Sequence, residues 1–103
     1  MAGYTNVAKL SDFREGKIRR YFVDNKEIGG VLWRERFHAF SNRCAHQDFQ
    51  LHFGYVEGDR LNCPIHYAVF DLESGRALGG PLDIADLPVY SIRVEGEDVR
   101  VSL

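Results

Sequence analysis

The chain has 103 residues, 45% of them hydrophobic, and its 13 basic and 15 acidic residues leave a formal net charge of −2. This length predicts one domain, and this charge balance offers no basic surface for nucleic acid. The first ten residues hold no apolar run of signal-peptide length, and the longest apolar stretch, 28–33, is too short to cross a bilayer. We therefore expect a cytoplasmic protein with no membrane anchor and no nucleic-acid partner.

Short β-rich segments alternate with turn-forming clusters along the chain. The turn clusters, rich in Asp, Asn, Glu and Gly, lie at 24–27, 34–36, 57–60, 73–76 and 95–98. Between them the sequence predicts strands at 18–23, 28–33, 37–40, 60–62, 89–94 and 99–101. Within the second of these, Gly29 and Gly30 indicate a bulge or a close approach of backbone.

Helical periodicity is weak throughout the sequence. No segment sustains a 3.6-residue apolar period over a dozen residues, and the best helical candidate is a short turn at 10–13, which Ser11 or Asp12 could cap. Many short strands at this spacing predict an all-β fold, an antiparallel sandwich or barrel.

Two Cys/His pairs carry the chemistry of the chain. Cys44 and His46 precede Cys63 and His66 by a sixteen-residue spacer, and together they use both cysteines and two of the four histidines. Each pair follows an expected strand, so we expect two loops to converge at one end of the sandwich. Thiolates beside imidazoles suit zinc or an iron–sulfur cluster better than calcium or magnesium.

The spacing of the pairs discriminates between these two metals. Structural zinc sites usually use C-x2–4-C and H-x3–5-H spacings, which C-x-H does not match. A 2Fe–2S centre with two Cys on one iron and two His on the other needs one Cys and one His from each loop. The pattern favours the cluster, with a structural zinc or interaction domain as the alternative.

The residues around both pairs resemble the Rieske family. The first loop reads Cys44-x-His46-x4-Leu51-x2-Gly54, and the second reads Cys63-Pro64-x-His66 followed by Phe70-Asp71, Ser74-Gly75, Gly79-Gly80-Pro81 and Leu87-Pro88-Val89-Tyr90. The likeness runs from about residue 7 to 101. It implies a single Rieske domain over 1–103, with about 42–82 forming a cluster-binding subdomain. It also implies one Rieske 2Fe–2S cluster per chain, bound by Cys44, His46, Cys63 and His66.

Four positions in or just after the second loop differ from other Rieske proteins. The family usually has Gly after the second His, where this chain has Tyr67, and the respiratory members carry a disulfide cysteine where this chain has Ile65. Positions that hold hydrogen-bonding Ser and Tyr in those high-potential members look like Ala68 and Phe70 here. Because hydrogen bonds to cluster sulfurs stabilise the reduced state, we expect a potential toward the lower end of the Rieske range of about −150 to +300 mV.

The resemblance implies a soluble one-electron carrier rather than an enzyme. The chain is similar to the ferredoxin components of aromatic-ring-hydroxylating dioxygenase systems. These pass electrons from an NAD(P)H-dependent flavin reductase to a terminal oxygenase, and we expect a monomer. The alternative is the small Rieske subunit of an NADH-dependent nitrite reductase.

An oxygenase is disfavoured by the remaining histidines. Its catalytic iron needs two His and a carboxylate, and only His38 and His52 remain. We interpret His38 as a strand residue and His52 as a loop residue. Trp33 is expected in the core, and Leu51 and Pro81 are expected to shield the cluster from water.

Overall fold

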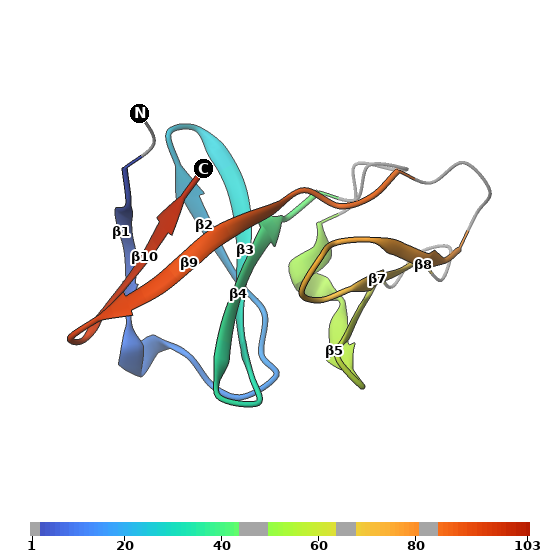
Figure 1. Cartoon of the computed structure of the whole chain (residues 1–103), viewed down its shortest axis with the longest axis horizontal. Coiled ribbons are helices and arrows are strands. Elements are labelled where there is room, and N and C mark those ends of the chain that lie inside the picture. Colours follow the sequence, from blue (N-terminus) through green and yellow to red (C-terminus); the bar gives the residue numbers. More distant parts are fainter. Residues whose placement is uncertain (1–2, 44–49, 64–67, 81–84) are drawn as a thin grey trace.

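Two antiparallel sheets make up the structure, a computed structural model that describes residues 3–43, 50–63, 68–80 and 85–103 (Figure 1). The larger sheet has the strand order β1-β10-β9-β4-β3-β2 and the smaller one β5-β6-β7-β8. The strands are β1 (Thr5–Lys9), β2 (Arg19–Val23), β3 (Lys26–Trp33), β4 (Arg36–Ser41), β5 (Tyr55–Glu57), β6 (Arg60–Asn62), β7 (Val69–Asp71), β8 (Ala77–Gly79), β9 (Val89–Glu95) and β10 (Asp98–Ser102). The all-β prediction is confirmed.

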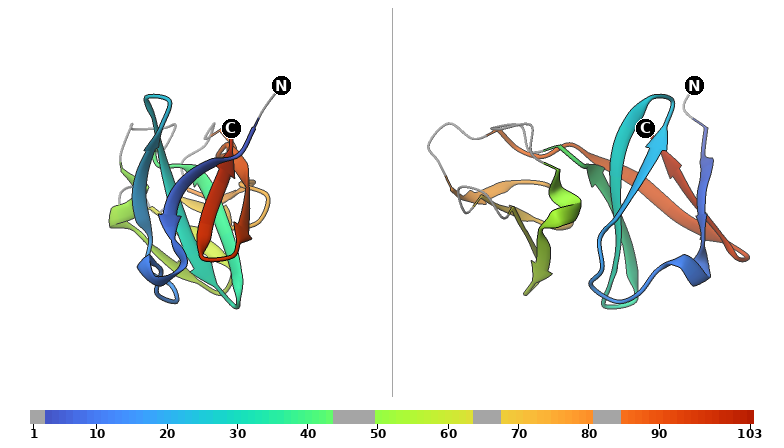
Figure 2. Two further views of the ribbon diagram at one scale, coloured as in Figure 1. Left: turned by 90° about the vertical axis from the view of Figure 1, so that its left-hand side faces the viewer. Right: turned by 180° about the vertical axis from the view of Figure 1, so that it is seen from behind.

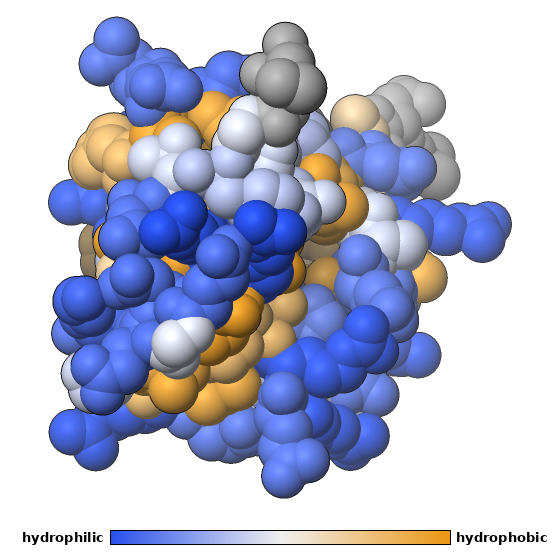
Figure 3. All heavy atoms as spheres, turned by 60° about the vertical axis from the view of Figure 1, so that its left-hand side comes forward, coloured by the Kyte–Doolittle hydropathy of each residue, from blue (hydrophilic) through white to orange (hydrophobic). Residues whose placement is uncertain are grey.

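The larger sheet curls toward a barrel. Its edge strands β1 and β2 contact each other, which brings the two ends of the sheet together. The smaller sheet lies beside one end of the larger one (Figure 1), and the view from behind shows the same arrangement (Figure 2, right). It is inserted between β4 and β9, which pair with each other in the larger sheet. On the face shown in Figure 3, polar side chains separate the exposed apolar ones.

Two-residue turns form the hairpins β2–β3 and β3–β4. Asp24 and Asn25 have φ values of 50° and 67°, and Arg34 and Glu35 have 52° and 66°. Positive φ at both central residues is the signature of the type I′ turn, whose twist matches that of the flanking strands. The turns are therefore shorter than the predicted 24–27 and 34–36, and Arg36 already belongs to β4.

Gly29 marks a close approach and not a bulge. The pairings of β3 with β2 and with β4 run without a register shift. A Cβ on Gly29 would overlap the ring of Phe40, which is 1% exposed. The absent side chain thus makes room for a large core residue on the neighbouring strand.

Two 3₁₀ turns are the helical elements of the described residues. The first, η1 (Leu10–Asp12), lies in the segment predicted as a short turn, and the carboxylate of Asp12 accepts a hydrogen bond from the Lys9 amide at 2.9 Å. The second, η2 (Leu51–Phe53), was not predicted. No helix in the described part of the chain is long and apolar enough to span a membrane.

One apolar core joins the two sheets, and we call it the shared core. It comprises Ile18, Val31, Phe40, Leu51, Leu61, Cys63, Ala68, Phe70, Leu72 and Leu87. Trp33, which was predicted as a core residue, is half-buried and packs against the shared core. Since its members come from both sheets, burial of this core fixes the position of the smaller sheet on the larger one.

Candidate metal centre

Cys63 is the one predicted ligand among the residues that the structure describes. It follows β6 directly and is 4% exposed within the shared core. Its amide donates a hydrogen bond to the carbonyl of Ala68 at 2.9 Å, which closes the chain around residues 64–67. Cys44, His46 and His66 lie outside the described residues, as do Ile65, Tyr67 and Pro81.

The first predicted ligand loop is closed in a similar way. Arg43 and Gln50 form an isolated antiparallel bridge on either side of residues 44–49. One step further out, the Leu51 amide donates a hydrogen bond to the carbonyl of Asn42 at 2.7 Å. Residues 42–43 therefore lie next to residues 50–51, and η2 follows at once.

The stems of the two loops meet. Leu51, which is 0% exposed, packs with Cys63 and Ala68 in the shared core. Gly54, at the end of η2, lies so close to the Asn62 carbonyl that a Cβ there would overlap it. The residues that begin and end the two ligand loops thus come together, as the prediction of converging loops requires.

Gly80 closes the same region from a third segment. Its φ is +122°, and a Cβ on it would lie 2.8 Å from the Cα of Ala68. A side chain is thus excluded by conformation and by space. Gly80, the residue that follows β8, therefore lies directly against Ala68 at the end of the second loop.

The environment of Cys63 fits an iron–sulfur ligand. Ala68 is 1% exposed and Phe70 0%; both belong to the same apolar core as Cys63, and neither side chain carries a hydroxyl group. Cys63 is itself buried, and a cysteine thiolate is a soft ligand of the kind that iron–sulfur clusters take. Within the described ranges, no three His, Cys, Asp or Glu side chains come together as another metal site.

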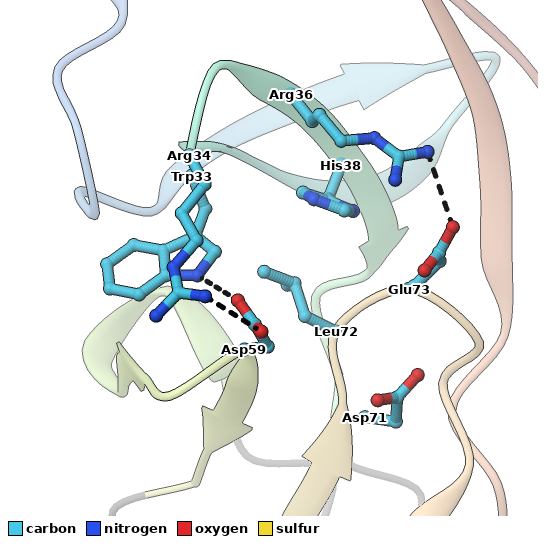
Figure 4. Close-up of a pocket in the computed structure, with 8 residues that line it drawn as sticks. All are labelled: Trp33, Arg34, Arg36, His38, Asp59, Asp71, Leu72 and Glu73. Carbon is cyan, nitrogen blue, oxygen red and sulfur yellow. Dashed lines mark hydrogen bonds and ion pairs between the residues drawn. The ribbon is translucent and has the colours of Figure 1, made fainter.

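His38 lies on β4 and lines a cavity between the two sheets (Figure 4). The cavity measures about 270 Å³ and is lined by Trp33, Arg34, Arg36, His38, Asp59, Asp71, Leu72 and Glu73. Burial, helped by Arg36, lowers the pKa of His38 despite the nearby carboxylates. The strand interpretation of His38 agrees with this position.

The charges of this cavity connect the two sheets. The indole N–H of Trp33 donates to an Asp59 carboxylate oxygen at 2.5 Å, and Arg34 contacts the other oxygen at 3.3 Å. Arg36 reaches Glu73 at 3.3 Å. These charged groups already pair with one another across the cavity. We therefore interpret the cavity as a polar contact between the two sheets and call it the polar joint.

His52, interpreted as a loop residue, lies on the 3₁₀ turn η2 and contacts a buried side chain that no sequence pattern indicated. It lies on η2 with its Nδ1 2.8 Å from the Nδ2 of Asn42, a side chain that is 0% exposed. Burial, together with the positive charge of Arg20, lowers the pKa of His52. Asn42 also donates to Glu27 on β3 at 2.6 Å.

Comparison with known proteins indicates which cofactor a site of this kind binds. The "3-phenylpropionate/cinnamic acid dioxygenase ferredoxin subunit" of Shigella boydii is 38% identical, covering 91% of this chain and 88% of that one. The ferredoxin component of the naphthalene 1,2-dioxygenase system of Pseudomonas putida is 31% identical, covering 97% and 95%.

A solved structure agrees in fold. In a complex of reduced oxygenase and oxidised ferredoxin of carbazole 1,9a-dioxygenase, the matching chain is 27% identical, with a TM-score of 0.86. The match covers 96% of this chain and 92% of that one. The model of the Rieske [2Fe-2S] domain matches residues 3–91, which favours the iron–sulfur cluster over zinc. The chain belongs to the Rieske [2Fe-2S] domain family.

Proposed function

We propose that this protein is a one-electron carrier whose single Rieske cluster is bound by Cys44, His46, Cys63 and His66. The observation that carries the proposal is the meeting of two closed loop stems around the buried Cys63, with C-x-H in one loop and C-x2-H in the other. The bound cluster would accept and release one electron. We also propose that about 42–82 act as the cluster-binding subdomain of a single domain spanning 1–103.

The side chains near Cys63 support a low reduction potential. Ala68 and Phe70 are buried and have no hydroxyl group to donate to a cluster sulfur. Each missing hydrogen bond leaves the extra negative charge of the reduced state less stabilised. We therefore place the potential toward the lower end of the Rieske range.

The partners follow from the relatives. Both curated relatives are named ferredoxin components or subunits of dioxygenase systems, and the solved complex pairs such a ferredoxin with its oxygenase. We propose that this chain, a cytoplasmic monomer, receives electrons from an NAD(P)H-dependent flavin reductase. It would deliver them to a terminal oxygenase and perform no catalysis itself.

The ligand assignment is tested by the same His-to-Cys substitution made at a proposed ligand and at a control histidine. We expect His66→Cys to keep some cluster but to lower the potential, because a thiolate adds negative charge. His38→Cys, the same change on β4 in the cavity between the two sheets, should leave the Rieske EPR signal and the potential unchanged. Iron and sulfide analysis with EPR of the dithionite-reduced protein gives both readouts. An unaltered potential in His66→Cys would overturn the assignment.

The carrier role is tested by reconstitution. With a dioxygenase reductase and its terminal oxygenase, the protein should support NAD(P)H-dependent product formation, and Cys63→Ser should not. Support of nitrite reduction alone would favour the nitrite reductase subunit instead.

A further inference from the structure

Asn42 is held by four hydrogen bonds just before the first ligand loop. Its amide donates to the Glu27 carbonyl at 3.2 Å, and its carbonyl accepts from Leu51 at 2.7 Å. Its side-chain Nδ2 lies 2.6 Å from Glu27 Oε2 and 2.8 Å from His52 Nδ1. The residue two positions before Cys44 is thus fixed to β3 of the larger sheet and to η2.

The orientation of the Asn42 amide is determined by its neighbours. A carboxylate can only accept, so Nδ2 must face Glu27, and His52 Nδ1 must then accept as well. The opposite amide orientation would place Oδ1 against the Glu27 carboxylate. Oδ1 itself is buried and has no donor among the described residues. Leaving a buried carbonyl oxygen unsatisfied is unfavourable, which supports a positioning role for Asn42 beyond stability.

Glu27 carries a nearly buried negative charge at this point. Its side chain is 9% exposed, and Arg43 contacts its Oε1 through Nη2 at 2.9 Å and Nε at 3.1 Å. Burial raises the pKa of Glu27, but the hydrogen bond from Asn42 and the charge of Arg43 outweigh it and hold the pKa below its ordinary value. The carboxylate is therefore ionised, and its partner cation directly precedes Cys44.

We propose that Glu27, Asn42 and Arg43 form an anchor that positions the first ligand loop and keeps the cluster's reduction potential low. Glu27 cancels the positive charge of Arg43 beside the first ligand. The inference rests on the proposed function, because it takes residues 44–49 as a ligand loop. All three are positioning residues.

The expected size follows from Coulomb's law. Reduction adds one negative charge to the cluster, so a nearby carboxylate such as that of Glu27 disfavours the reduced state. A unit charge about 10 Å away, at an effective dielectric constant of about 40, changes a one-electron equilibrium about fourfold. Removing the charge of Glu27 should therefore raise the potential.

The decisive experiment compares Glu27→Gln with Glu73→Gln in the full-length, cluster-loaded protein. Gln keeps an oxygen that can accept from Asn42. Glu73 also pairs with an arginine, Arg36 at 3.3 Å, but both side chains there are more than two-thirds exposed. We expect Glu27→Gln to shift the reduction equilibrium toward the reduced form at least threefold, about 28 mV at 59 mV per tenfold. Glu73→Gln should shift it less. Equal shifts, or a fall in potential for Glu27→Gln, would overturn the anchor.

Arg43→Gln should have the opposite effect on the reduction potential. It should lower the potential, and Glu27→Gln combined with Arg43→Gln should return it toward the parent value. If Glu27→Gln alone fails to load, the double variant is compared with Arg43→Gln, and a double variant that is not higher overturns the proposal. Iron, sulfide and EPR are measured on every variant. A parent without a Rieske signal refutes the proposed function, whereas a normal signal with unmoved potentials refutes only the anchor.

Discussion

Leu51→Ala should be among the most destabilising single changes that leave all four proposed ligands intact. Leu51 is 0% exposed and packs with Cys63 and Ala68 where the two loop stems meet. Truncating a fully buried leucine costs about 2–5 kcal/mol through lost burial and the cavity left behind. A domain of this size has a free energy of unfolding of roughly 5–15 kcal/mol, so the loss is a large fraction of its stability. Water admitted beside Cys63 should also speed loss of the cluster.

The matched control is Leu78→Ala. Leu78 lies on β8 and is 47% exposed, so the same truncation should cost less than about 0.5 kcal/mol. Thermal unfolding of the loaded proteins at one scan rate should show a midpoint at least about 8 °C lower for Leu51→Ala. Decay of the visible cluster absorbance in a chelator gives the second readout. Equal midpoints and equal decay rates in the two variants would refute the role of Leu51 in this packing.

Three further changes test other parts of the site. Gly54→Ala should destabilise by about 1–3 kcal/mol, because its Cβ would overlap the carbonyl of Asn62, whereas Gly79→Ala meets open space and should be neutral in denaturant unfolding. His38 has a folded pKa below its unfolded value, so its contribution is present above about pH 6.5 and is lost as the pH falls toward the folded pKa. His38→Gln should therefore flatten the fall in stability between about pH 7 and 5, and an unchanged slope would contradict this. Phe70→Tyr should raise the reduction potential if its hydroxyl reaches a cluster sulfur, and voltammetry showing no shift would place that position away from the cluster.

Local sequence chemistry predicts the larger sheet well. The stretch from β2 to β4 alternates long strands with two-residue turns. Asp24 and Asn25 tolerate the positive φ of such a turn, whereas Arg34 and Glu35 adopt it without that local preference. The predicted turns 24–27 and 34–36 were too long, because their last residues already belong to the strands that follow. Cys63 also emerges directly after the expected strand 60–62, because a β-rich segment followed by Cys-Pro has a clear end.

Long-range contacts are what the sequence could not reveal. β5 and β8 have three residues each, too few for alternation to show, and β1 is fixed by pairing with β10 at the other end of the chain. Asn42 and Glu27 are fifteen residues apart, and nothing local indicates that one is fully buried against the other. Such pairs arise only when the sheet is assembled.

The apolar core, and not the ion pairs between the two sheets, must hold the two ligand loops in place relative to each other. The first loop is tied to the larger sheet through Asn42, whereas the second closes a hairpin of the smaller sheet at Cys63. Any movement between the sheets would therefore change the distance between the loops. The Arg34–Asp59 and Arg36–Glu73 pairs span this joint, but they are largely exposed and contribute at most about 1 kcal/mol each. The ten buried residues of the shared core contribute far more, because burying one large apolar side chain is worth about 1.5–3 kcal/mol. A carrier that must change little in geometry on reduction thus gains its rigidity from packing beside the centre itself.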